Sequence, residues 1–182
     1  MKVIVAITAA SGAIYSHLVL EHLIRSSQVE RIALIMSDNA AAVVEHEGEC
    51  LPSSDKIEVM DNHAMFSSVA SGSARWDAMI VVPSSMGTVG RVAAGISQTL
   101  IERAADVMLK ERRRLILVVR ETPYSLIHLR NMTTLTEAGA IILPASPSFY
   151  SHPETIEALA TTVVERIMAH VGISEQRYEW GK

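Results

Sequence analysis

The sequence predicts an α/β domain in which a parallel sheet carries helices on both faces. Short apolar, β-branched segments alternate with longer segments whose apolar residues recur at helical spacing, the pattern of repeated βαβ units. A length of 182 residues suits a single domain with one core, here expected to span residues 1–182. An apolar fraction of 49% with only 20% charged residues indicates a sheet buried on both faces, with subunit interfaces in addition.

Six short segments rich in β-branched and other apolar residues each predict a buried strand. The first ends at the small-residue loop Ala9 to Gly12, the fourth at Pro83, and the fifth at the charged pair Arg120-Glu121. In chain order the expected strands cover residues 2–8, 31–36, 57–60, 78–82, 115–119 and 140–143.

The segments between these strands predict helices. Ser37-Asp38-Asn39 is a start signal for the second helix, and Gly95 ends the third. Residues 65–75, which contain Ser71-Gly72-Ser73, are expected to form a loop or a broken helix. In chain order the expected helices cover residues 13–25, 40–47, 88–94, 100–113, 125–138 and 153–171.

Two of the strand-to-helix junctions are built alike, from small and hydroxyl side chains. Thr8 to Gly12 and Pro83 to Thr88 both precede a helix, where free backbone N–H groups and the positive helix end favour a phosphate. Ser and Thr also cap helices without binding anything. The dinucleotide fingerprint GxGxxG is absent. With Ser37-Asp38-Asn39 as a third polar strand end, the junctions favour a mononucleotide cofactor, and FMN fits best.

Charged residues follow the fifth strand directly, at the edge of the sheet where open α/β folds bind their ligands. Arg120 is expected to hold an anionic ligand there and Glu121 to move a proton, unless the two simply mark the strand end. Arg103 and Lys110 precede this strand, and their spacing from Asp106 also suits surface ion pairs.

For three further residues the sequence allows more than one role. Tyr150 and Arg166 suit either a binding site or an ordinary rim aromatic and helix arginine. His128 is better explained as a capping or core histidine than as a base.

Composition excludes several classes of function. A net charge of −4 argues against binding nucleic acid through a basic surface. Cys50 is the only cysteine, and the scattered histidines form no ligand motif, so no metal site is expected. No apolar run approaches the roughly 20 residues needed to span a bilayer. The N-terminal segment divides into strand, loop and helix and does not read as a signal peptide, so the cytoplasm is expected.

Long motifs add a resemblance to a known family. LIERAADVMLKERRRLILVVRETPYSLIHLRNM, with SGAIY, VVPSSMGT and AGAIILPASPSFY, resembles the UbiX/Pad-type flavin prenyltransferases, of the flavoprotein family within the flavodoxin-like cysteine decarboxylase superfamily. The resemblance covers residues 3–173 and implies a single flavodoxin-like (Rossmann-like) domain that binds FMN. It also implies a metal-independent transfer of a dimethylallyl group from dimethylallyl monophosphate to N5 and C6 of reduced FMN. The prenylated FMN would serve UbiD-type decarboxylases, and the enzyme would form a homo-oligomer, typically a dodecamer, with active sites at subunit contacts.

The resemblance also assigns site residues by position. The implied FMN contacts are Ala9, Ala10, Ser11, Ser37, Ser85, Met86, Gly87, Thr88 and Arg120. The implied contacts of dimethylallyl phosphate are Lys110, Arg120, Glu121, Tyr150 and Arg166. The implied catalytic residues are Glu121, Lys110, Glu47 and Arg103.

The chain departs from the family pattern at two places. Ala9 stands where many members have glycine. An aromatic residue that some members carry between the third strand and Ser71 has Met65 as its nearest match, which leaves the wall of the prenyl pocket undefined.

Other functions on the same fold stay open. A flavin-dependent cysteine decarboxylase would carry a PxMNxxMW-type segment, whereas this chain has Leu129-Arg130-Asn131-Met132. An FMN-dependent aromatic-acid decarboxylase is a second alternative. A non-catalytic flavin-binding or electron-transfer protein is a third, although a carrier has little use for so many charged residues at one edge.

Overall fold

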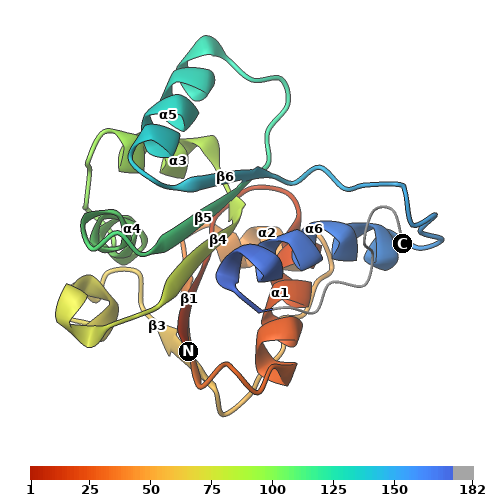
Figure 1. Ribbon diagram of the computed structural model, residues 1–182, viewed down its shortest axis with the longest axis horizontal. Helices are drawn as coiled ribbons and strands as arrows, with labels where there is room; N and C mark the ends of the chain where they lie inside the picture. Colours follow the sequence, from red (N-terminus) through yellow and green to blue (C-terminus); the bar gives the residue numbers. More distant parts are fainter. Residues whose placement is uncertain (174–182) are drawn as a thin grey trace.

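A single parallel sheet forms the centre of the computed structural model, which describes residues 1–173 (Figure 1). In the described chain its strands are β1 (Lys2–Ile7), β2 (Arg31–Met36), β3 (Ile57–Met60), β4 (Ala78–Ser84), β5 (Arg114–Val119) and β6 (Ile141–Pro144). They lie in the order β3-β2-β1-β4-β5-β6, and every neighbouring pair is parallel. The flavodoxin-like (Rossmann-like) α/β class expected from the sequence is confirmed.

Helices cover both faces of the sheet. Within the described residues they are α1 (Ala13–Arg25), α2 (Ala40–His46), α3 (Met86–Ala93), α4 (Leu100–Lys110), α5 (Leu126–Glu137) and α6 (Ile156–Val171). Two short 3-10 turns, η1 (Ser68–Ala70) and η2 (Gly72–Ala74), form the broken helix expected over 65–75. None of the described helices has the length and apolar character that crossing a membrane would require.

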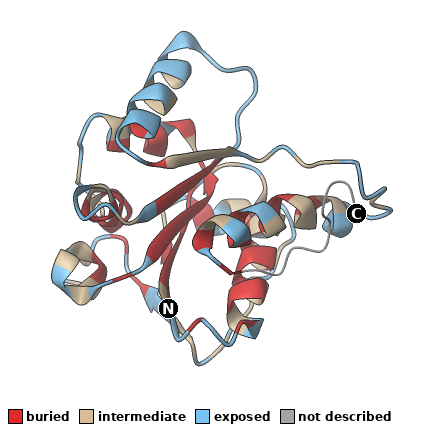
Figure 2. Ribbon diagram, viewed as in Figure 1, coloured by how far each residue is buried: buried red, intermediate tan, exposed pale blue. Residues whose placement is uncertain are grey.

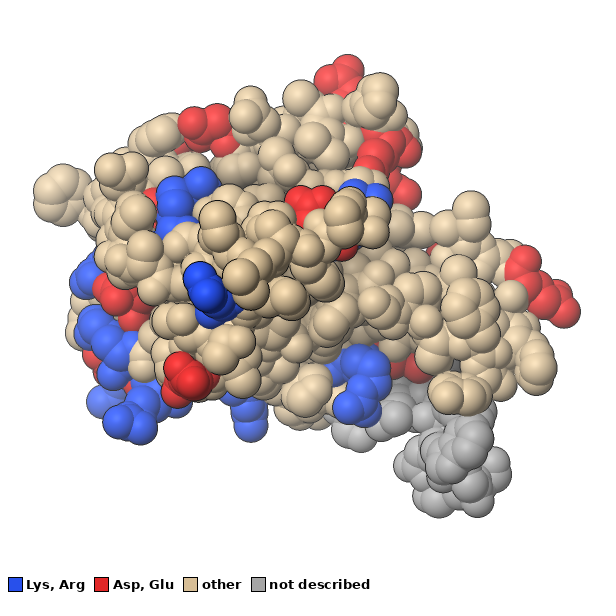
Figure 3. All heavy atoms as spheres, turned by 90° about the horizontal axis from the view of Figure 1, so that it is seen from above, with Lys and Arg blue, Asp and Glu red and all other residues tan. Residues whose placement is uncertain are grey.

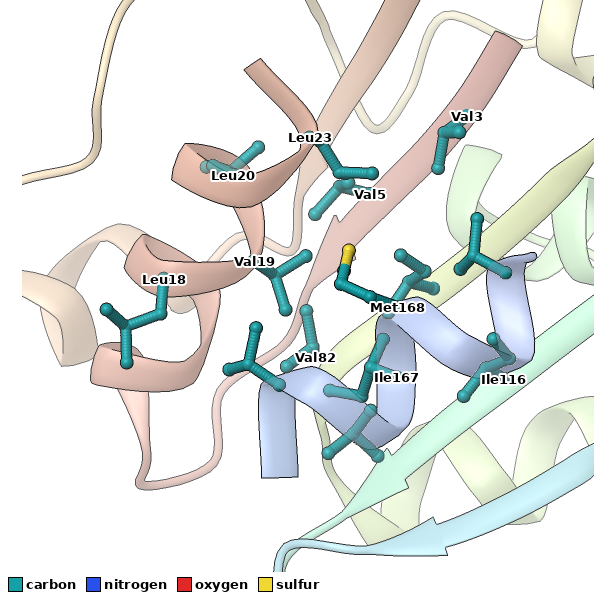
Figure 4. Close-up of a cluster of buried hydrophobic side chains, with 14 of the residues drawn as sticks. Val3, Val5, Leu18, Val19, Leu20, Leu23, Val82, Ile116, Ile167 and Met168 are labelled. Carbon is teal, nitrogen blue, oxygen red and sulfur yellow. The ribbon is translucent and has the colours of Figure 1, made fainter. Parts of the chain in front are cut away.

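The two faces bury separate cores because alternate strand residues point to opposite sides. On one side, Val3 and Val5 of β1 pack under α1 and α6 (Figure 4). On the other, Ile4 and Ala6 pack with residues of α3 and α4. The central strands are buried, whereas most of α5 is exposed (Figure 2).

The strand order places a switch point between β1 and β4. The chain moves outward from β1 to β3, returns to β4 beside β1, and then moves outward the other way to β6. β1 and β4 pair in register from Val3 with Ala78 to Ala6 with Val81. The connections leave these strands in opposite directions, so a crevice opens at their carboxyl ends, where ligands of such sheets bind.

Element boundaries differ from the sequence expectation where a local conformation intervenes. The helix expected over 100–113 ends at Lys110, because the chain turns before β5 and Arg112 adopts a left-handed φ of 53°. β4 continues through Pro83 to Ser84, and its pairing with β5 shifts register between Val81 and Ser84, which accommodates the missing proline N–H. The final helix starts three residues later than expected, where Thr155 accepts a bond from the N–H of Ala158.

One buried hydroxyl joins the loops that follow β1 and β4. Thr8 is 2% exposed, and its Oγ1 donates to the carbonyl of Pro83 at 2.8 Å. The same oxygen accepts from the N–H of Ser85, also at 2.8 Å. Ser84 beside it is equally buried, but its hydroxyl has no hydrogen-bond partner among the described residues.

This contrast predicts that two similar substitutions differ in their effect on stability. Thr8→Val keeps the shape and removes the bridging hydroxyl. The N–H of Ser85 then loses its acceptor, while the carbonyl of Pro83 keeps only the N–H of Thr8, at 3.3 Å, which costs about 1–3 kcal/mol of unfolding free energy. Ser84→Ala removes a hydroxyl without a partner and is expected to be nearly neutral. Urea unfolding of the two variants and wild type measures the difference. Equal destabilisation by both changes would contradict the bridging role of Thr8.

Candidate functional site

A cavity of about 430 Å³ lies at the carboxyl edge of the sheet, over the switch point. Its volume falls within the 300–1,000 Å³ or so typical of small-molecule sites. The walls come from the ends of β1, β2 and β4, the segment after β3, helix α3, and the segment that leads into α4 with its first turn. The lining residues are Thr8, Ala9, Ser37, Asp38, Asn39, Asn62, Ser85, Thr88, Arg91, Gln98, Thr99, Ile101 and Glu102.

The start of α3 provides a cradle for a phosphate in this cavity. Ser85 is the N-cap residue, and its Oγ accepts from the N–H of Thr88 at 3.3 Å. The two hydroxyls lie 3.1 Å apart. The N–H groups of Met86 and Gly87 belong to the first turn, where a helix has no acceptor of its own to offer. The Met86 side chain is buried in the core, so only its backbone is available to a ligand.

The start of α1 is arranged differently from the sequence expectation. The carboxylate of Glu47 accepts from the N–H of Ala13 at 2.7 Å and from that of Gly12 at 3.0 Å. This carboxylate therefore takes the place at the helix N-terminus where a phosphate was expected. Of the first loop, Ala9 lines the cavity, whereas Ala10 and Ser11 do not.

Glu47 belongs to a small polar group that also includes Arg120 and Tyr15. Burial acts to raise the pKa of Glu47, but hydrogen bonds from Ser11, Ala13 and Gly12, together with the charge of Arg120, outweigh it and hold the pKa below its usual value. Burial raises the pKa of the Tyr15 hydroxyl, and Arg120 opposes this shift. Arg120 thus acts on both groups, and Glu47 is an anion beside a cation at neutral pH.

Arg120 and Glu121 lie at the carboxyl edge, as expected, directly after β5. Both are exposed. The N–H of Arg120 reaches the carbonyl of Ser84 at 3.4 Å, which ties this segment to the end of β4. Glu121 Oε1 accepts from the N–H of Thr122 at 3.0 Å.

Lys110 lies at the opposite edge of the same sheet. It is the last residue of α4, four residues before β5 begins, whereas Arg120 follows the end of β5. Six strand residues at about 3.3 Å each separate the two edges by roughly 20 Å. One chain therefore does not bring Lys110 together with Arg120 and Glu121. Its ammonium pairs with Glu111 at 2.5 Å.

Of the two ion pairs that spacing along α4 allows, Arg103 with Asp106 and Asp106 with Lys110, the structure contains the first. Nη1 of Arg103 donates to Asp106 at 2.6 Å, and its Nε donates to the carbonyl of Ala70 at 3.1 Å. The surface-pair interpretation is correct for Arg103 with Asp106, whereas Lys110 takes Glu111 in place of Asp106.

Tyr150 and Arg166 lie away from the cavity at the switch point. Tyr150 is in an exposed turn between β6 and α6. Arg166 lines a second cavity, of about 930 Å³, between that connection and α6. His128 is a capping residue, since Ser125 Oγ accepts from its N–H and its Nδ1 accepts from the N–H of Ser125, as expected.

Several cavity residues have no counterpart in the sequence-based site. Thr99 and Glu102 form a capping box at the start of α4, a pattern readable in the sequence as Thr-x-x-Glu. Arg91 pairs with Glu102 across two helices, and nothing in the sequence indicates that contact. Asn62 holds the start of α4 through its carbonyl, which accepts from the N–H of Leu100 at 2.7 Å.

Comparison with known proteins supports a flavin site. The family model described as Flavoprotein matches residues 1–170. The flavin prenyltransferase UbiX of Methanocaldococcus jannaschii is 40% identical over all of this chain and 99% of its own length. A crystal structure of AnUbiX in complex with FMN and dimethylallyl pyrophosphate has 43% identity, covers 98% of both chains and superposes with a TM-score of 0.88. A dodecameric FMN-dependent UbiX-like decarboxylase from Escherichia coli O157:H7 has 37% identity, covers both chains fully and gives a TM-score of 0.92.

The lowered pKa of Glu47 predicts a pH-dependent contribution to stability. Because the folded pKa lies below the unfolded one, ionised Glu47 stabilises the fold above roughly pH 4.3, and this stabilisation is lost as the pH falls through the folded pKa. Glu47→Gln is therefore expected to lower Tm at pH 7 and to differ less and less from wild type as the pH falls below the ordinary range of a glutamate. Melting curves from pH 7 to 3 test this, with Glu45→Gln as the control for loss of charge alone. A difference in Tm between Glu47→Gln and wild type that stays constant with pH would refute the capping role of Glu47.

Proposed function

Because the chain belongs to the Flavoprotein family and is a flavin prenyltransferase that uses FMN, we propose that it joins the dimethylallyl group of dimethylallyl monophosphate to N5 and C6 of reduced FMN. We propose further that residues 1–182 serve as one FMN-binding domain and that a UbiD-type decarboxylase receives the prenylated FMN. The observation that carries the proposal is the cavity at the switch point, with its hydroxyl groups and helix N-terminus.

The donors of this cavity suit FMN. Hydroxyls of Ser37, Ser85 and Thr88 and the first turn of α3 offer hydrogen bonds to one phosphate. The walls near Thr8 and Ala9 are small enough for a close approach of the ligand. Ala10, Ser11 and Arg120 then lie toward the flavin ring in this proposal. Bound there, reduced FMN supplies the electron-rich atoms that accept the allyl group.

Charged side chains supply what the departure of a phosphate requires. As the allylic C–O bond breaks, negative charge grows on the leaving phosphate, and cations stabilise it without a metal ion. Arg120, Arg166 and Lys110 are the proposed cations, with Arg103 nearby and Tyr150 as a neutral donor. Arginine matches phosphate oxygens with two parallel N–H groups.

Two carboxylates are proposed to handle protons. Glu121, in its acid form, donates a proton to the departing phosphate, and the carboxylate so formed later removes one from the adduct. Glu47, whose pKa is held low, is ionised at neutral pH; it is proposed to place a negative charge near the ring and to act there only as a weak base.

The separation of Lys110 from Glu121 supports an active site shared between subunits. In this proposal Lys110 of one chain completes the site at the carboxyl edge of another. Apolar side chains available for such contacts include Leu126, Ile127 and Leu129 of α5, of which Ile127 is 68% exposed. On the face seen in Figure 3, from the α5 side, Lys, Arg, Asp and Glu form scattered clusters, many of them toward the margins, with stretches of other residues between them. The related dodecamer supports a homo-oligomer, and we propose a dodecamer for this chain.

A direct assay tests the function. Purified protein, reduced FMN and dimethylallyl monophosphate, mixed without oxygen and with EDTA, are expected to yield a flavin whose mass has grown by one dimethylallyl unit. Chelation is expected to leave the rate unchanged, because side-chain cations take the place of a metal. Failure to modify the flavin, combined with CO₂ release from an aromatic acid, would favour the decarboxylase alternative.

Co-expression of two inactive variants tests the shared site. Lys110→Ala and Glu121→Gln are each expected to be slow alone. If the two residues enter one site from different chains, about a quarter of sites in a random mixture keep both, and activity returns to that extent. Arg120→Ala with Glu121→Gln is the matched control, because these neighbours follow the same strand and are expected to serve one site together. Recovery in both mixtures, or in neither, would contradict the shared arrangement.

A further inference from the structure

An ion pair on the cavity wall has no role in the function described so far. Arg91, from the last turn of α3, meets Glu102, from the first turn of α4, and both line the cavity at the switch point. We propose that Arg91 binds the phosphate of FMN directly and that Glu102 positions it. This inference rests on the proposed function and adds a phosphate ligand to it.

Glu102 is built as a fixed anchor. The residue is 2% exposed. Its Oε1 accepts from Nε of Arg91, and its Oε2 accepts from the N–H groups of Gln98 at 2.8 Å and Thr99 at 3.0 Å. Burial acts to raise the pKa of Glu102, but these hydrogen bonds outweigh it and keep the pKa low. The carboxylate is thus charged, and both its oxygens are engaged in holding the arginine and the start of α4.

The guanidinium is held beside the first turn of α3. Its Nη2 lies 3.4 Å from Thr88 Oγ1. A Cβ placed on Gly87 would come within 3.3 Å of Nη1, so Nη1 lies next to that residue. Glycine at this position leaves room for the guanidinium to lie against the first turn.

The side chain of Arg91 is 45% exposed and paired with Glu102 through Nε, which leaves the rest of its guanidinium available to a second anion. The N-terminus of a helix carries partial positive charge and repels a cation. Glu102 offsets the charge of Arg91, but it accepts a hydrogen bond only from Nε of the guanidinium. No described residue accepts a hydrogen bond from Nη1. A phosphate beside Ser85 and Thr88 would accept from Nη1 and from the helix at once.

Other charges near the cavity do not take this role. Asp38, the other acidic residue of the wall, is paired with His63, whose Nε2 lies 3.1 Å from Asp38 Oδ1. Among Lys and Arg residues, Arg91 alone lines this cavity in the described part of the chain. The three cations proposed for the leaving phosphate, Arg120, Arg166 and Lys110, lie outside the lining.

Riboflavin, which is FMN without its phosphate, isolates the contribution of Arg91. Arg91→Met is expected to weaken FMN binding about tenfold or more while riboflavin affinity stays at the wild-type value. Quenching of flavin fluorescence measures both dissociation constants. Arg25→Met is the matched control: it breaks the exposed ion pair of Arg25 with Glu21, 2.9 Å apart, and is expected to change neither affinity.

A conservative variant guards against a folding defect. Arg91→Lys keeps a cation for Glu102 but loses the forked donor, so it is expected to fold and to lower FMN affinity relative to riboflavin by less than Arg91→Met. Either variant that binds both flavins as wild type does, or loses both equally, would overturn the role of Arg91. The proposed function is tested separately: wild type that forms prenylated flavin in the assay with dimethylallyl monophosphate upholds it whatever the binding of these variants.

Discussion

The hydroxyl of Thr8 is the contact on which the site depends. It lies between the carbonyl of Pro83 and the N–H of Ser85, so the loops after β1 and β4 are held at a fixed distance. These strands are the pair from which the chain departs in opposite directions, and the cavity opens between them. A buried hydroxyl with both partners satisfied is rigid, and it carries that rigidity to Ser85 and the start of α3.

Two carboxylates decide where a phosphate fits. Glu47 occupies the N–H groups at the start of α1, and Glu102 occupies those before α4. The start of α3 is capped by a neutral hydroxyl, Ser85, and has Arg91 beside it. Of these three helix starts, α3 is therefore the one at which an added anion meets no carboxylate. Each of these carboxylates also interacts with an arginine: Glu47 remains ionised near Arg120, and Glu102 accepts a hydrogen bond from Arg91.

The parallel sheet separates residues that the proposed chemistry needs together. Strands that all point one way collect Ser37, Ser85 and Arg120 at one edge, and the returning helix α4 carries Lys110 to the other. The segment from Lys110 to Arg120 therefore runs the full length of β5, from one end of the strands to the other. In the proposed oligomer, contact between subunits removes this distance without any change within a chain, and the exposed apolar side chains of α5 are available for that contact.

The sequence by itself determined the α/β class and the succession of strands and helices along the chain, because both follow from local periodicity. It also placed polar residues at the carboxyl edge, because the carboxyl ends of parallel strands meet there. FMN was inferred from the loops and the resemblance, while the individual site residues and the cytoplasmic location stay predictions. Only the tertiary structure decided that Glu47 caps α1, that Arg91 meets Glu102, and that Lys110 lies at the far edge. Each of these joins segments distant in sequence, and such contacts depend on how helices pack across the sheet, which local pattern does not encode.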